Sequence, residues 1–104
     1  MSKTTTKPST LQIDLQFQPL HTPEAILNAI YIPASDAIEQ YGLINSYCNI
    51  HIKLGKRSKL FVQVEIDALT SDVKYFAAHN PKVGQFLPAL SYTQALNTIR
   101  QLMA

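Results

Sequence analysis

The residues of this sequence that could do chemistry are few and widely spaced. Two carboxylates at expected strand positions, Asp14 and Glu65, are of the type that serves as a general acid and base pair. No nucleophile or glycine-rich pocket loop accompanies them, and the sequence has no Walker loop, dinucleotide fingerprint, zinc spacing or nucleophile elbow. We therefore expect no catalytic residues, and we expect that the protein is not an enzyme.

Histidine and cysteine give no sign of a metal or redox centre. The histidines, His21, His51 and His79, lie on different expected elements, without a second ligand at metal-binding spacing. The single cysteine, Cys48, has no adjacent histidine and stands on the apolar side of an expected strand, which favours core packing over catalysis. We expect no metal and no cofactor, and a lone cysteine fits a reducing, cytoplasmic location.

Positive charge is the chemical feature that clusters. Lys53, Lys56, Arg57 and Lys59 stand close together in a chain whose formal charge is only +2, so any affinity for nucleic acid must come from this cluster. Such a cluster can hold phosphate, or it can be a solvated turn that discourages strand-edge pairing. With neighbouring aromatic and amide side chains, the expected binding residues are Tyr47, His51, Lys53, Lys56, Arg57, Lys59, Phe61 and Gln63.

The cluster is expected at the tip of a β-hairpin that runs from Ser46 to Ile66. Apolar residues alternate with polar or aromatic ones in both arms, and a period of two indicates strands. Apolar side chains must face one another, so the numbers of paired residues must sum to an even value. This rule predicts a tip at residues 55–59 and the pairs Leu54 with Leu60, Ile52 with Val62 and Ile50 with Val64.

Before the hairpin, the sequence predicts a strand and helical structure. Leu11 to Gln18 alternates and ends at Pro19, which is typical of a strand. Thr22 can cap a helix that stops before Pro33, and Gly42 can end a second short helix. Whether these are two helices or one kinked helix is left open.

After the hairpin, two more helices are expected. Thr70 or Ser71 can cap a first one, in which Val73, Phe76 and Ala77 share a side. Residues 81–90 are expected to be mostly loop, with 85–90 as a candidate short edge strand. The last helix has a capping box of Ser91 and Gln94, followed by an apolar stripe that docks on its own sheet or forms a dimer seam.

These elements predict one domain of the α+β class, over residues 11–104, after a flexible tail over residues 1–10. We expect a two-layer sandwich: an antiparallel sheet of three to four strands with helices on one face and an extra C-terminal helix. The expected order is ferredoxin-like, with the third strand between the first and the second. Hydrophobic residues make up 46% of the chain and charged residues 15%, which excludes a disordered protein, and no apolar run is long enough to span a membrane.

Residues 39–84 resemble a degenerate RNA recognition motif. The residues that carry the likeness are Tyr41, Gly42 and Ile44, then Ser58 to Ile66, then Asn80, Lys82, Val83 and Gly84. The resemblance implies a ferredoxin-like α+β fold and RNA binding on the open face of the sheet. Of the two aromatic positions in the family's third-strand signature, Phe61 keeps the base-stacking side chain.

The expected function is that of a small, non-catalytic protein-interaction module, such as an accessory, regulatory or inhibitory subunit. A polar sheet face of mixed charge is typical of a non-obligate protein interface. The alternative is binding of RNA or single-stranded DNA through the basic hairpin tip and the open sheet face. Another protein is thus the expected partner, with nucleic acid as the alternative; a membrane is not expected, and monomer and homodimer both stay open.

Overall fold

Four strands and two helices make up the part of the chain that the computed structural model describes, residues 10–15 and 22–104. In chain order they are β1 (Thr10–Leu15), α1 (Pro23–Tyr41), β2 (Asn45–Lys53), β3 (Lys59–Asp67), β4 (Asp72–His79) and α2 (Tyr92–Met103). The expected tail lies outside the described residues except for Thr10, which begins β1. Residues 16–18 of the expected first strand, and His21, also lie outside them.

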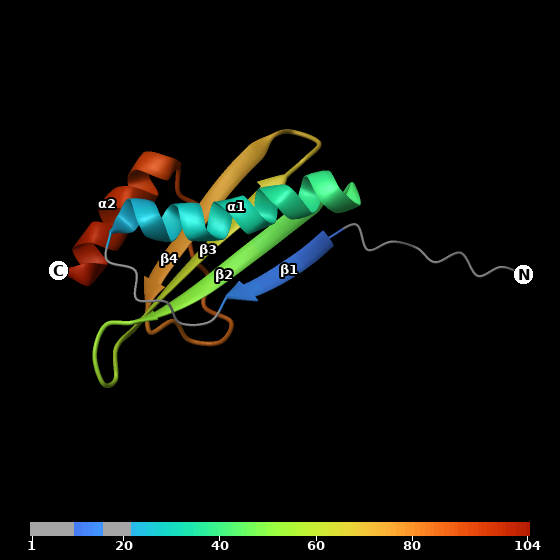
Figure 1. Cartoon of the computed structure of the whole chain (residues 1–104). Helices are drawn as coiled ribbons and strands as arrows, with labels where there is room; N and C mark the ends of the chain where they lie inside the picture. The colour runs from blue at the N-terminus through green and yellow to red at the C-terminus, as the bar shows by residue number, and fades with distance from the viewer. Residues whose placement is uncertain (1–9, 16–21) are drawn as a thin grey trace, which may run out of the picture.

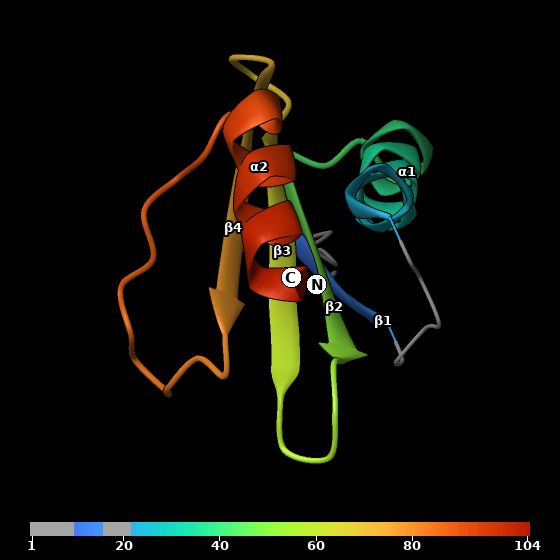
Figure 2. The same ribbon diagram turned by 90° about the vertical axis from the view of Figure 1, so that its left-hand side faces the viewer.

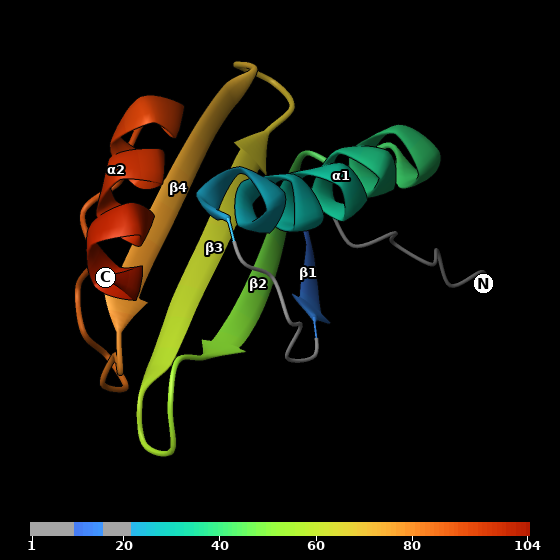
Figure 3. The same ribbon diagram turned by 60° about the vertical axis from the view of Figure 1, so that its left-hand side comes forward.

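The strands form one sheet in the order β1-β2-β3-β4, and both helices lie on the same face of it (Figures 1 and 3). The α+β class is therefore confirmed. The expected antiparallel sheet is wrong because β1 runs parallel to β2, which makes the sheet mixed. The ferredoxin-like order is also not found. Short turns join β2 to β3 and β3 to β4, so both edges of β3 are already paired and β1 cannot lie beside it; β1 pairs with the outer edge of β2 instead.

The segment expected to be a helix after Thr70 or Ser71 is strand β4, which pairs with β3 along its whole length. The connecting turn fits this outcome. The Asp67 carboxylate accepts the backbone N–H groups of Leu69 and Thr70 at 2.9 and 3.3 Å, and Ser71 has a φ of 64°. A tight turn of this kind returns the chain along β3, where its backbone groups find partners at once.

Helix α1 is one continuous helix that passes through Pro33. Proline cannot donate to the preceding turn and normally interrupts a helix. Here the buried stripe continues on both sides of it, and Ile30 and Ala34 are both fully buried against the sheet. Burial of this stripe outweighs the free-energy cost of a proline inside the helix. The helix therefore does not end at Ile32, where the sequence led us to expect its end. Thr22 and Gly42 cap the helix as expected, Gly42 with a φ of 62°.

The β2–β3 hairpin is confirmed, but its register differs by two residues from the expected one. Ile52 pairs with Leu60 and Ile50 with Val62, so the parity is right and the pairing itself is shifted. The loop is Leu54–Ser58, in which the Leu54 N–H donates to the Ser58 carbonyl at 2.8 Å. Alternation fixes which face a residue occupies, and a shift of two keeps every face unchanged.

The C-terminal helix is also confirmed, with the expected reciprocal capping box of Ser91 and Gln94. It packs against β4 and beside α1, and Ile99 is completely buried there, as expected for a helix that docks on its own sheet (Figure 2). Residues 85–90 form no strand; Leu90 alone makes a backbone bridge to Tyr75 on the outer edge of β4. None of the helices in the described ranges is long and apolar enough to cross a membrane.

The core fills the space between the helices and the sheet. Its fully buried large side chains are Ile26, Leu27, Ile30, Ile50, Leu60, Val62, Val64 and Ile99. Alternate residues of each strand point into this layer, so the residues between them point to the opposite side of the sheet. That opposite side, called here the open face, carries the strand residues among the expected binding residues.

Candidate functional site

The open face brings together side chains from all four strands. The register places Asp14 beside Asn49, His51 beside Phe61, and Gln63 beside Phe76. His51, Phe61 and Gln63 were expected as binding residues from the sequence. The sheet itself therefore sets their spacing, through backbone pairing that does not depend on any ligand.

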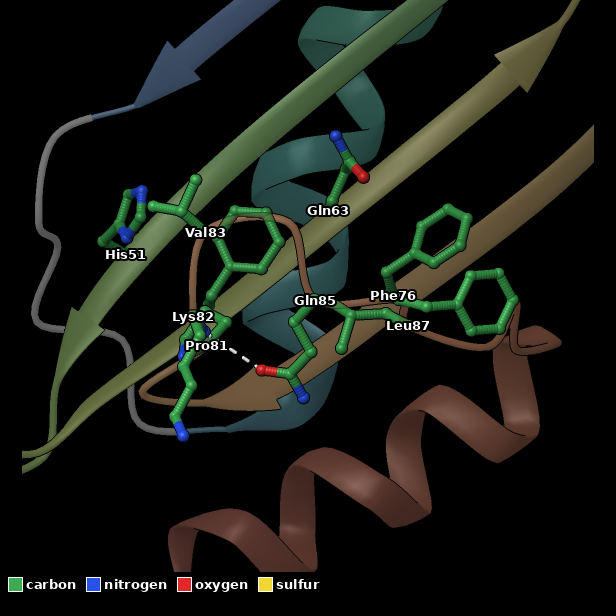
Figure 4. Close-up of a pocket in the computed structure, with 10 residues that line it drawn as sticks. His51, Gln63, Phe76, Pro81, Lys82, Val83, Gln85 and Leu87 are labelled. Atoms are coloured by element: carbon green, nitrogen blue, oxygen red, sulfur yellow. Dashed lines mark hydrogen bonds between the residues drawn. The ribbon is translucent and has the colours of Figure 1, made fainter.

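A groove of about 540 Å³ lies on this face, over β3 and β4 (Figure 4). We call it the aromatic groove. Its described lining residues come from three strands and from the loop after β4: His51, Phe61, Gln63, Phe76, Pro81, Lys82, Val83, Gln85, Phe86 and Leu87. Most of these are aromatic or aliphatic, and a groove of this size and lining is typical of a binding site.

The floor of the groove is built from rings on adjacent strands. The His51 and Phe61 rings lie 5.3 Å apart between centroids and are tilted by 53°. Phe76 comes from β4, opposite Gln63, and is half-buried like Phe61. Tilted ring pairs at this separation are favourable beyond the area that they bury, so the rings hold one another in place.

The outer wall of the groove is a turn in the loop that follows β4. The Lys82 N–H donates to the Gln85 side-chain oxygen at 3.0 Å (Figure 4). The Gln85 N–H in turn donates to the Lys82 carbonyl, also at 3.0 Å. Gly84 has a φ of 80°, which such a turn requires at its third position. The turn projects Val83 into solvent, and the side chain of Phe86 is 87% exposed close to it.

A second depression, of about 410 Å³, adjoins the groove at the hairpin end of the sheet. We call it the basic hollow. It is lined by His51, Arg57, Lys59, Asn80 and Pro81. Asn80 ties two of its walls together: its N–H donates to the Lys59 carbonyl at 2.9 Å and its side-chain oxygen accepts the Lys59 N–H at 2.8 Å.

The expected binding residues are thus divided among three places. His51, Phe61 and Gln63 line the groove, while His51, Arg57 and Lys59 line the hollow. Lys53 is opposite Lys59 in the last pair of the hairpin and Lys56 is in its loop; neither is among the residues that line the hollow. Tyr47 shares the open face but is opposite Glu65, away from both depressions.

Sequence reasoning missed Phe76 and the loop residues of the groove. Phe76 was placed in a helix, where it shared a side with Val73 and Ala77. The signal that could have found it is the alternation of Val73, Tyr75 and Ala77 with Lys74, Phe76 and Ala78. The helical period and the strand period both fit so short a stretch, but its aromatic and β-branched residues favour a strand.

The two carboxylates considered for acid–base chemistry are not neighbours, because β2 separates β1, with Asp14, from β3, with Glu65. The Asn49 side-chain amide donates to Asp14 at 2.8 Å. This hydrogen bond, with a second one from Gln12, holds the pKa of Asp14 below its usual value. Asp14 is therefore ionised at neutral pH and lacks the raised pKa of a general acid.

Cys48 points into the core and is completely buried. Burial, followed by the nearby charge of Asp14, raises the pKa of its thiol to about 11. Cys48 is thus a poor nucleophile at neutral pH. No group of three or more metal-binding side chains occurs within residues 10–15 and 22–104.

Comparison with models of known protein families, with characterised proteins and with solved structures found no match for this chain. Its function is therefore inferred from its own sequence and from the groove and the hollow.

Proposed function

We propose that this protein is a small protein-interaction module whose binding surface is the aromatic groove. One observation carries the proposal: at the rim of a groove with an apolar lining, Val83 is fully exposed and Phe86 is 87% exposed. Apolar side chains held in water beside an apolar groove mark a surface that a partner covers. Covering a side chain the size of phenylalanine stabilises a complex by about 1.5 to 3 kcal/mol.

The composition of the groove supports binding rather than catalysis. The described residues that line it include no serine, cysteine, aspartate or glutamate. Its polar groups are the side chains of His51, Gln63, Lys82 and Gln85, and Gln85 already caps its own turn. A few polar groups around aromatic anchors are typical of an interface centre.

Photo-crosslinking in cells tests this function. A benzophenone amino acid placed at Phe86 is expected to form an adduct with another polypeptide, because position 86 projects at the rim of the groove. The matched control carries the same amino acid at Asn28, an exposed position of α1 in the helical layer. Equal adducts at both positions, or none at position 86, would contradict the proposal.

A second candidate function, binding of single-stranded nucleic acid, is favoured by the basic hollow. Arg57 and Lys59 line a depression next to the Phe61 and His51 rings, and cations beside rings are the usual elements of such sites. The resemblance of residues 39–84 to an RNA recognition motif supports the same candidate. Against it, the loop at residues 81–87 walls the groove, and Phe61 and Phe76 are half-buried where a base would need a free ring face.

A further inference from the structure

The aromatic groove and the basic hollow are adjacent parts of one surface. His51 and Pro81 line both, so a ligand in the groove reaches the hollow without crossing another wall. The two parts differ in chemistry: the groove is mainly apolar, while the hollow presents Arg57 and Lys59. A ligand that fills both must join an apolar group to an anionic one.

Charge is unevenly distributed over the described residues. Of their seven lysines and arginines, five gather at the hairpin end: Lys53, Lys56, Arg57, Lys59 and Lys82. The opposite end of the open face carries Glu65, Asp67 and Asp72, which lie toward the β3–β4 turn. Lys53 and Lys59 are directly opposite one another, so two of these cations occupy one cross-strand pair.

We propose that the groove and the hollow together bind an extended, acidic peptide segment of the partner, with an apolar side chain in the groove and a carboxylate in the hollow. This inference rests on the proposed function, and it adds the chemical class of the partner segment.

The spacing within β3 fixes the spacing expected in the peptide. Phe61, in the groove, and Lys59, in the hollow, are two residues apart on the same face of the strand. They are therefore separated by about 6 to 7 Å along the strand. An extended peptide that runs beside them also repeats its side chains at every second residue. The expected segment thus has an acidic residue two positions away from its apolar anchor.

The distribution of charge favours carboxylates on a peptide over the backbone of a nucleic acid. A polynucleotide carries a phosphate at every nucleotide, so a strand lying along the sheet would bring phosphates toward Glu65 and Asp67 as well as toward the lysines. A peptide can place its charge at one end and apolar or neutral residues elsewhere. Only the peptide matches a surface that is cationic at one end and acidic at the other.

Fluorescence anisotropy with designed peptides tests the inference. The probe is a fluorescein-labelled peptide of about 12 residues with one phenylalanine, followed by aspartates at the second and fourth positions after it, in a glycine–serine background. One control replaces the aspartates by lysine, a second replaces the phenylalanine by serine, and a third is single-stranded oligouridylate of similar length. We expect the acidic probe to bind at least about tenfold more tightly than each control at about 50 mM salt.

Three variants locate the binding. Phe86→Ala and Arg57→Gln are each expected to weaken binding of the acidic probe several-fold. Phe86→Ala removes an apolar wall of the groove, and Arg57→Gln removes a cation of the hollow. Lys74→Gln is the matched control: it also removes one positive charge from the open face, but at the acidic end. All three side chains are exposed, and unchanged thermal unfolding will show that the variants fold.

Equal binding of the acidic and lysine peptides, or tighter binding of oligouridylate, would overturn the inference, as would equal losses in Arg57→Gln and Lys74→Gln. A specific adduct at position 86 together with no preference for acidic peptides would leave the protein-interaction function standing and remove only this partner class.

Discussion

Asn80 is the residue on which the geometry of the basic hollow depends most directly. It has a φ of 47°, in the left-handed region, and both its backbone and its side chain bond to Lys59. Asparagine tolerates this conformation better than most residues with a side chain. Asn80 thus follows the last residue of β4 and begins the loop that walls the groove. Its bonds to Lys59 also hold the start of β3 beside the end of β4.

Replacing Asn80 by alanine is expected to destabilise the fold by about 1 to 3 kcal/mol, because it removes the side-chain hydrogen bond to Lys59 and because alanine tolerates positive φ less well than asparagine. Asn80→Gly is expected to lose less, since glycine accepts positive φ at no steric cost. Urea denaturation of the two variants measures both effects. Equal losses would show that the left-handed backbone contributes nothing to the cost.

Cys48 predicts a stability change at alkaline pH. The unfolded thiol ionises near pH 9, whereas burial raises the pKa of the folded one to about 11. Between these values the unfolded state has lost its proton and the folded state keeps it, so the stability contribution of Cys48 falls as pH rises from about 9 to about 11.

The matched control is Cys48→Ala, which has no thiol to titrate. The difference in unfolding free energy between wild type and Cys48→Ala is expected to shrink as pH rises through this window in urea denaturation. A constant difference would mean that the thiol titrates alike in both states.

At the scale of the element, the sequence predicted correctly those segments in which the spacing of apolar residues fits either a helix or a strand, but not both. Helix α2 follows from its capping box and stripe, and the β2–β3 hairpin follows from long alternation. Strand β4 was missed because Val73, Phe76 and Ala77 fit a helical stripe as well as a strand. Whether this segment forms a helix or a strand is decided by its pairing with β3, and a local sequence pattern carries no information about that pairing. The continuity of α1 through Pro33 was undecided for the same reason, since burial against the sheet settles it.

The core face of the β2–β3 hairpin gives a test of packing. Ile52 and Val62 are buried side chains, 3% and 0% exposed, on neighbouring antiparallel strands. Truncating either to alanine is expected to cost about 2 to 4 kcal/mol, because it leaves a cavity between the sheet and the helices. Their amides are also expected to exchange among the slowest in the protein. A loss below about 0.5 kcal/mol, the range of surface substitutions, would contradict the assigned burial.

At the scale of the whole molecule, part of the site was visible in the sequence and part was not. The cations between Lys53 and Lys59 are adjacent along the chain, so their cluster could be read directly. The groove is assembled from three strands and from a loop more than 20 residues beyond the hairpin tip. Its assembly depends on the order of the strands, and the expected ferredoxin-like order would have placed different neighbours beside Phe61.

The net charge of the chain is only +2, while its cations are concentrated at the hairpin tip. The salt dependence of binding therefore tests the nucleic-acid candidate. If single-stranded RNA or DNA binds, replacing Lys56, Arg57 and Lys59 together by alanine is expected to lower the log–log salt slope by up to about three units. Phe61→Ala is expected to cost about 1 to 3 kcal/mol if Phe61 stacks on a base. Titrations at about 50 and 200 mM salt measure both changes. Absence of binding at the lower salt would exclude this candidate.

The loop that walls the groove is fastened at both ends by backbone hydrogen bonds. Asn80 bonds to Lys59 at one end, and Leu90 exchanges two bonds with Tyr75 at the other, at 2.8 and 3.0 Å. The strands and helices are therefore complete without residues 82–87, and changes there leave the anchors in place. If the groove binds a partner as proposed, mutations in this span would alter which partner is bound at little cost in folding. The fold thus separates the residues that must be kept from those that are free to diverge during evolution.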